Sequence, residues 1–361
     1  MSIAMGSPLR IRAGSAPHER PAQPALRFRR PLTRDEYIEG ILRGDRHVLS
    51  RAITLIESSR AADRDLADEV VEACLPHTGR ALRVGITGVP GAGKSTLIEA
   101  VGQYILGEYG QTVAVLAVDP TSQITGGSIL GDRTRMVALS SCEGAFIRPS
   151  PSRGSHGGVA QSTREAMLLC EAAGYQNIVV ETVGVGQSET AVHGMVDFFL
   201  VVMLAGAGDE LQGIKRGVME LAHLVAINKA DGENIAAVER TRSEAERALH
   251  YFPAAVSGWT PRAIACSALT GRGIPALWNA VQEFAELARA NGSFERNRCD
   301  QRRRWLRDAL DQGLARLFRS HALVSQHMPE YEREVTEGRI TPFRAARQLL
   351  EIYTGASRAG L

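Results

Sequence analysis

The sequence predicts an α/β fold built on a doubly wound, mostly parallel sheet, with helical extensions before and after it. Strand-like and helix-like stretches alternate from Leu82 onward, which is typical of right-handed βαβ units. The run Thr112–Val118 is almost wholly apolar, as expected of a strand buried on both faces of a parallel sheet. A glycine-rich stretch, Gly88–Ser95, joins a strand to a helix. Ligands of such sheets bind at the carboxyl ends of the strands, so polar motifs at those ends are the functional candidates.

The expected strands are short, and most are apolar along their whole length. They are Leu82–Thr87, Thr112–Val118, Gly144–Arg148, Asn177–Val180, Phe198–Leu204, Leu224–Ile227 and Ala263–Cys266. Helical periodicity marks the segments between and around them. The expected helices are one beginning near Thr33, then Asp45–Ser59, Ala62–Leu75, one beginning at Thr96, Val159–Ala173, Leu211–Leu221, Ile235–Leu249, Ile274–Ala290, Arg296–Leu323 and Phe343–Tyr353.

This pattern divides the chain into four parts. They are a disordered basic tail over 1–33, a helical segment over 34–80, a nucleotide-binding domain over 81–291 and a C-terminal helical dimerisation element over 292–361. The tail is rich in arginine and poor in acids, which is also typical of a mitochondrial transit peptide. Its prolines interrupt any amphipathic helix, which favours a disordered tail and a cytoplasmic protein.

Composition excludes several classes of partner and site. The formal net charge is +2, from 42 basic and 40 acidic residues, so nothing points to nucleic acid. No apolar run reaches 18 residues, so we expect no membrane span. The cysteines lie far apart without a C-x-x-C pair, which indicates a reducing compartment and argues against a cysteine-built metal site. They are Cys74, Cys142, Cys170, Cys266 and Cys299.

The glycine-rich stretch has the pattern G-x-x-x-x-G-K-S between a strand and a helix, which is a P-loop. Its residues are Gly88, Val89, Pro90, Gly91, Ala92, Gly93, Lys94 and Ser95, followed by Thr96. The glycines let backbone N–H groups surround a phosphate chain, and the helix N-terminus favours the same anion. Lys94 would reach the outer phosphates, and Ser95 would hold Mg²⁺.

Two later strand ends predict that the base is guanine. Asn228-Lys229-Ala230-Asp231 is an N-K-x-D motif, and the Asp231 carboxylate can accept hydrogen bonds from guanine N1 and N2. Adenine would leave that carboxylate facing an acceptor, at a cost of about 1–3 kcal/mol. Lys229 can lie over the base. Backbone N–H groups of Ser267-Ala268-Leu269 could meet guanine O6.

Other strand ends offer ligands for the metal and groups for hydrolysis. Oxygen ligands besides Ser95 are needed, and the candidates are Asp119, Asp132 and Glu181. Gly184 follows Glu181 at the spacing that would bring a backbone N–H near the γ-phosphate. The glycine-rich, charged loop 206–215 could bring Gln212 or Lys215 toward the phosphates. Its alternative reading is an ordinary strand-to-helix loop.

A short match to a cobalamin-binding motif is better explained as helix. Asp45-Arg46-His47 begins the pattern D-x-H-x-x-G, but Ser50 stands where that pattern has glycine. The segment also has helical periodicity. We therefore expect no cobalamin site in this chain.

Four long motifs together resemble the MeaB/ArgK group of P-loop GTPases, of the SIMIBI class, whose metal-site strand ends in Glu. The motifs are Val118–Ser122, Gly126–Met136, Glu181–Glu189 and Gly208–Lys215. The resemblance extends from about residue 36 to about 353. Thr121 stands where relatives often have serine, and the hydroxyl is retained.

The resemblance implies a GTPase chaperone for an adenosylcobalamin-dependent acyl-CoA mutase, usually methylmalonyl-CoA mutase. It also implies Mg²⁺ held near Ser95, Asp119, Asp132 and Glu181, and GTP or GDP as the bound nucleotide. Glu181 and Lys94 would join Gln212 and Lys215 as catalytic candidates. C-terminal helices would form a homodimer.

Two other classes of function remain as alternatives. A metallochaperone GTPase would carry His-rich or Cys-based sites, whereas the nine histidines here are dispersed. A kinase or ATPase linked to amino-acid transport would favour ATP, whereas N-K-x-D favours GTP, and no kinase H-R-D or D-F-G motif is present.

Overall fold

The structure, a computed structural model, describes residues 30–58, 60–118, 136–149, 156–182, 188–205, 216–252 and 257–355. Contacts divide the chain into Met1–Thr33 and Arg34–Leu361, and every helix and strand below belongs to the second unit. The predicted basic tail lies almost wholly outside the described residues. The finer boundaries at residues 81 and 292 stay predictions.

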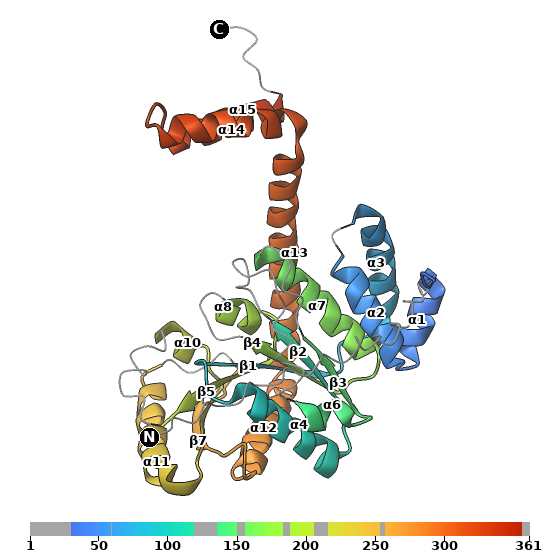
Figure 1. The fold of residues 1–361 in the computed structure, drawn as a ribbon. Coiled ribbons are helices and arrows are strands. Elements are labelled where there is room, and N and C mark those ends of the chain that lie inside the picture. The colour runs from blue at the N-terminus through green and yellow to red at the C-terminus, as the bar shows by residue number, and fades with distance from the viewer. Residues whose placement is uncertain are drawn as a thin grey trace, which may run out of the picture. The chain divides into compact units, whose positions relative to one another are not determined.

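Seven parallel strands form one sheet in the order β3-β2-β4-β1-β5-β6-β7 (Figure 1). The strands are β1 Leu82–Gly88, β2 Val113–Val118, β3 Ala145–Arg148, β4 Asn177–Thr182, β5 Phe198–Leu204, β6 Leu224–Asn228 and β7 Arg262–Ala265. The predicted doubly wound α/β fold is confirmed. Strand β1 lies between β4 and β5, so its carboxyl end opens at the middle of the sheet.

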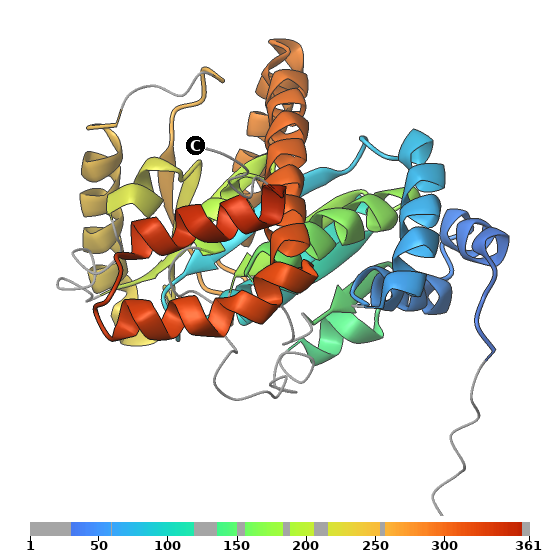
Figure 2. The same cartoon turned by 90° about the horizontal axis from the view of Figure 1, so that it is seen from above.

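Helices cover both faces of the sheet (Figures 1 and 2). On one face α4 (Lys94–Tyr109), α6 (Val137–Ser141) and α12 (Ile274–Ala290) contribute side chains to a continuous apolar core with the strands. On the other face lie α7 (His156–Ala172) and α8 (Ser188–His193). Helix α10 (Arg216–Glu220) joins β5 to β6, and η2 (Gly232–Asn234) and α11 (Ile235–Leu249) join β6 to β7. None of the described helices combines the length and apolarity needed to cross a membrane.

Three helices precede the sheet. They are α1 (Arg34–Leu42), α2 (Arg46–Ile56) and α3 (Ala61–Cys74), and a short turn, η1 (Leu75–His77), leads to β1. Asp45 is the N-cap of α2, because its Oδ1 accepts hydrogen bonds from the backbone N–H of His47 at 2.8 Å and of Val48 at 3.1 Å. The carboxylate therefore has a local structural role, and His47 is a helical residue.

Three helices follow α12, one more than the sequence predicts. They are α13 (Ser293–Ser320), α14 (Ala322–Thr336) and α15 (Pro342–Thr354). Helix α14 contains Pro329, which removes a backbone donor and argues against a helix in any sequence-based prediction. Thr341 caps α15 by accepting a hydrogen bond from the backbone N–H of Arg344.

An aromatic cluster closes the core near the amino ends of β5 and β6. The His223 ring stacks on Phe198 at 5.4 Å and lies 4.7 Å from the ring of Phe284. Its Nδ1 accepts a hydrogen bond from the backbone N–H of Phe199 at 2.9 Å, so the ring is neutral with its proton on Nε2. Burial and, to a lesser extent, nearby His193 together lower the pKa of His223 to about 3, against a smaller opposite effect of Asp197.

This buried histidine makes the folded state sensitive to acid. The unfolded chain binds a proton on His223 near pH 6.5, whereas the folded chain does so only near pH 3. As the pH falls from 6.5 to about 3, His223 is therefore expected to lower the free energy of unfolding by up to about 1.4 kcal/mol per pH unit. Urea unfolding at pH 7, 6, 5 and 4 measures the slope. His223→Asn keeps an acceptor for the backbone N–H of Phe199 but does not titrate, so the free energy of unfolding of this variant should depend less on pH. An unchanged pH dependence in the variant would show that His223 is not the source of the acid sensitivity.

Candidate functional site

The phosphate loop lies between the end of β1 and the start of α4, and two of its glycines are required by close packing. Gly88 has φ 150°, and a Cβ there would lie 2.1 Å from the carbonyl oxygen of Val202 on β5. Gly93 has φ 83°, and a Cβ there would lie 2.7 Å from the side-chain nitrogen of Asn228. Both positions need a residue without a side chain, so the glycines of the motif shape the loop itself.

Lys94 begins α4 and turns back over the loop. Its Nζ donates hydrogen bonds to the carbonyl oxygens of Gly88 at 2.9 Å and Val89 at 3.3 Å. Only 8% of Lys94 is exposed. The ammonium group is thus held above the first residues of the loop, where a phosphate chain would run.

Ser95 and Glu181 meet at the carboxyl edge of the sheet. The Ser95 hydroxyl donates a hydrogen bond to Glu181 Oε1 at 2.9 Å, and β4 pairs with β1 so that Glu181 lies opposite Ile86. A hydroxyl and a carboxylate in contact are the oxygen donors that Mg²⁺ prefers. The residues present therefore fit a magnesium ion, which Ser95 and Glu181 would hold.

Asn228, at the end of β6, joins two of the loops. Its Nδ2 donates to the carbonyl oxygen of Ala92 in the phosphate loop at 2.8 Å, and its Oδ1 accepts from the backbone N–H of Ala268 at 3.1 Å. The residue is 2% exposed. The next residue, Lys229, has a backbone φ of 65°, which is unusual for a residue other than glycine. Such strained backbone conformations are typical of functional loops.

Asp231 is oriented by Ser267 from the neighbouring strand end. The Ser267 hydroxyl donates a short hydrogen bond to Asp231 Oδ2. We call Ser267–Leu269, whose backbone N–H groups were predicted to bind guanine O6, the base loop. Two of these three N–H groups already donate hydrogen bonds within the protein, Ser267 N to Arg272 O and Ala268 N to Asn228 Oδ1. Of the three, Leu269 N alone has no acceptor within the described residues, and its side chain is 82% exposed. Leu269 is therefore the better candidate for guanine O6.

The fold thus brings together the predicted residues at the ends of β1, β4, β6 and β7. Other predicted site residues lie outside the described part of the chain. They are Asp119, Asp132, Gly184, Gln212 and Lys215. Within it, one buried carboxylate near this edge was not predicted as a site residue. Glu189, in the first turn of α8, is 8% exposed, and the sequence marks it only as the last residue of the motif Glu181–Glu189.

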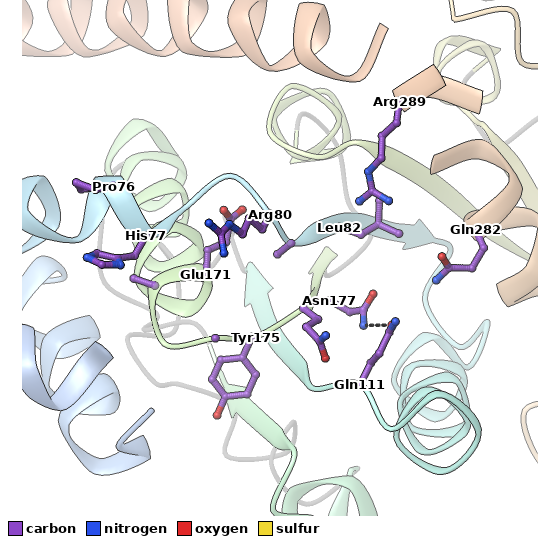
Figure 3. Close-up of a pocket in the computed structure, with 14 residues that line it drawn as sticks. Pro76, His77, Arg80, Leu82, Gln111, Glu171, Tyr175, Asn177, Gln282 and Arg289 are labelled. Atoms are coloured by element: carbon purple, nitrogen blue, oxygen red, sulfur yellow. Dashed lines mark hydrogen bonds between the residues drawn. The ribbon is translucent and has the colours of Figure 1, made fainter. Parts of the chain in front are cut away.

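A separate cavity of about 480 Å³ lies at the opposite, amino edge of the sheet (Figure 3). Arg80 and Arg289 line it together with Gln111 and Asn177, and the Asn177 side chain donates to Gln111 Oε1 at 3.0 Å. Of the predicted site residues that the structure describes, none lines this cavity. The nucleotide chemistry therefore has to be sought at the other edge.

Comparison with known proteins identifies the family. Residues 49–322 match the family model described as "Methylmalonyl Co-A mutase-associated GTPase MeaB". The chain is 45% identical over 320 residues to "GTPase ArgK" of Escherichia coli strain K12, covering 88% of this chain and 95% of that protein. It is 42% identical over 329 residues to the mouse protein named "Methylmalonic aciduria type A homolog, mitochondrial", covering 88% and 79%.

A solved structure supports the same relationship. It is titled "Crystal structure of LAO/AO transport system kinase", and it matches with a TM-score of 0.71 at 38% identity, covering 89% of this chain and 98% of that chain. The resemblance seen in the motifs is therefore confirmed. The chain belongs to the MeaB family of GTPases, which bind and hydrolyse GTP.

Proposed function

We propose that this GTPase is a chaperone that gates the loading of adenosylcobalamin onto an acyl-CoA mutase and protects or reactivates that enzyme. The observation that carries the proposal is the family match over residues 49–322, whose description names association with methylmalonyl-CoA mutase. The client is methylmalonyl-CoA mutase or a relative that acts on a similar acyl-CoA. The cytoplasm remains the proposed compartment.

In this proposal the phosphate loop is the fixed floor of the site. Backbone N–H groups between Gly88 and Thr96 surround the phosphates, and Lys94 neutralises charge on the outer ones. Asp231 and Leu269 read guanine, with Lys229 over the base. Gly184 contributes a backbone N–H near the γ-phosphate. The contacts of Asn228 with both loops support this assignment, since they fix the distance between phosphate and base positions.

Ser95, Asp119, Asp132 and Glu181 form the proposed magnesium site. Bound Mg²⁺ would neutralise charge that develops on the phosphate oxygens during transfer. The contact between Ser95 and Glu181 supports the first and last of these ligands. Gln212 and Lys215 stay the proposed catalytic movers, one of which would orient the attacking water.

We also propose a homodimer formed through the C-terminal helices. Four leucines of α13 recur at helical spacing and are exposed: Leu306 at 62%, Leu310 at 56%, Leu314 at 59% and Leu317 at 59%. An apolar row of this kind on a helix is typical of a surface that a second chain covers.

The alternatives are less well supported. Within the described residues no group of three or more His, Cys, Asp or Glu side chains could hold a metal ion, which weighs against a metallochaperone. A kinase linked to amino-acid transport would have to use ATP, whereas Asp231 and Ser267 form a pair suited to guanine.

The guanine assignment predicts a switch of nucleotide. Asp231→Asn loses an acceptor for guanine N1 and N2, and an unpaired buried group costs about 1–3 kcal/mol, so the affinity for GTP is expected to fall roughly 10- to 100-fold. Xanthosine triphosphate, with an oxygen in place of the amine, should bind the variant better than it binds the wild type. Competition with a fluorescent GDP analogue measures the affinities of wild type and variant for GTP and for xanthosine triphosphate. If Asp231→Asn still prefers GTP, Asp231 does not recognise the base. If ATP competes better than GTP for the wild-type protein, the alternative of a kinase linked to amino-acid transport is favoured.

The chaperone proposal predicts that the mutase accelerates hydrolysis. Phosphate release from GTP is expected to be slow for the chain alone and several-fold faster when purified methylmalonyl-CoA mutase or a related mutase is added. Lys94→Ala, which lacks the phosphate-binding ammonium, serves as the control and should stay inactive with the mutase present. Equal turnover with and without each candidate mutase would contradict the proposed role but not the GTPase assignment.

A further inference from the structure

The first turns of α13 are bound to the amino edge of the sheet by a buried ionic cluster. Arg298 donates to both carboxylate oxygens of Asp197, from Nε at 2.9 Å and from Nη2 at 2.7 Å. It also donates to the carbonyl oxygens of Gly79 at 2.8 Å and Ala81 at 2.6 Å, directly before β1. Arg298 and Asp197 are 2% and 3% exposed. One guanidinium group therefore ties α13 to the entry of β1 and to the residue before β5.

Two more side chains of α13 reach the same short segment. Gln301 Nε2 donates to the carbonyl oxygen of Val196 at 2.7 Å, and Trp305 Nε1 donates to that of Gly194 at 3.1 Å. Residues 298, 301 and 305 lie on one face of a helix, because they are three and four positions apart. We call these three residues the α13 clamp. The hydrogen bonds described here fall on residues 194–197, which connect α8 to β5, or on the entry of β1.

Helix α8 depends on such contacts for its orientation. It has six residues, and isolated helices shorter than about 12–15 residues are marginal in water. On its inner side it packs against β1 at Gly85, where a Cβ would lie 2.9 Å from side-chain atoms of Val192 and Val196. The clamp holds the end of the same segment from the α13 side. The position of α8 is thus set by β4 and β1 and, through the segment that follows it, by α13.

The other end of α8 lies toward the nucleotide edge. Glu189 precedes Val192 by three residues and shares its helix face, one turn closer to the carboxyl end of β1. Its Oε2 is buried and has no hydrogen-bond partner in the described part of the chain. A buried carboxylate oxygen without a partner calls for an explanation beyond folding. A role beside the phosphates, reached only when α8 is correctly placed, supplies one.

We propose that Arg298, Gln301 and Trp305 are positioning residues for GTP hydrolysis: they fix the segment 194–197 and thereby place α8, with Glu189, at the phosphate edge. The proposal goes beyond the chaperone role and does not depend on any client, because it concerns the chain's own rate of hydrolysis. Among the described residues, the hydrogen bonds of the clamp reach neither the phosphate loop nor the base loop. They should therefore affect turnover more than nucleotide affinity.

Two variants test the clamp without removing the buried charges. Gln301→Met removes the bond to Val196, and because Gln301 Oε1 itself has no partner within the described residues, it also deletes an unsatisfied acceptor. Trp305→Phe removes the bond to Gly194 but keeps an aromatic ring beside the guanidinium groups of Arg83 and Arg164. Each is expected to lower the single-turnover rate of GTP hydrolysis at least fivefold, with the Kd for a fluorescent GDP analogue within twofold of wild type.

Two controls separate positioning from loss of fold. Arg303→Gln changes an exposed residue of the same helix and should hydrolyse GTP at the wild-type rate. Ile53→Val weakens the buried core of the N-terminal helices, away from the clamp. This variant measures how much the rate of GTP hydrolysis falls when Tm falls for a reason unrelated to the clamp. The proposal is overturned if both clamp variants keep the wild-type rate. It is also overturned if Ile53→Val loses as much rate at an equal loss of Tm, or if the clamp variants lose GDP affinity in proportion to rate.

Discussion

Asn228 is the side chain on which the geometry of the nucleotide site depends. Its buried amide binds the phosphate loop at Ala92 and the base loop at Ala268, so two loops that follow different strands are held at one spacing. The parallel register of β1, β5, β6 and β7 sets the height of those loops along the strands. Leaving either the amide nitrogen or the amide oxygen of Asn228 without its partner would cost about 1–3 kcal/mol. Neither loop can therefore shift alone without that penalty. The floor of the site is therefore held together by contacts within the chain itself.

The two edges of the sheet are stabilised in different ways. At the carboxyl edge, glycines without side chains let backbone approach backbone, as Gly88 does at Val202. At the amino edge, charged side chains are buried in pairs, such as Arg298 with Asp197 and Arg83 with Glu171. Burying a charge pair brings little net stability, but breaking one is costly. Such pairs are thus better suited to fixing where α13 lies than to strengthening the fold.

Most of the sheet and the phosphate loop could be predicted from the sequence, because both are encoded locally. Continuous apolar runs mark strands buried on two faces, and β5 was predicted to the residue. Helix α14 could not be predicted, since Pro329 argues against it, and it is its packing on α13 and α15 that outweighs that preference. The clamp could not be predicted either. Arg298 lies 101 residues from Asp197, and one arginine in an arginine-rich helix gives no local sign of its partner.

The long helix α13 links these features to the chain's proposed partners. It runs unbroken from Ser293 to Ser320, so the clamp near its start and the exposed leucines beyond it belong to one stiff element. At a rise of about 1.5 Å per residue, Leu314 lies about 24 Å along this helix from Arg298. A second copy seated on those leucines, as in the proposed homodimer, would contact the same helix that carries the clamp without entering the nucleotide site. This arrangement would let a partner regulate hydrolysis while the phosphate and base loops, fixed by Asn228, keep the nucleotide bound.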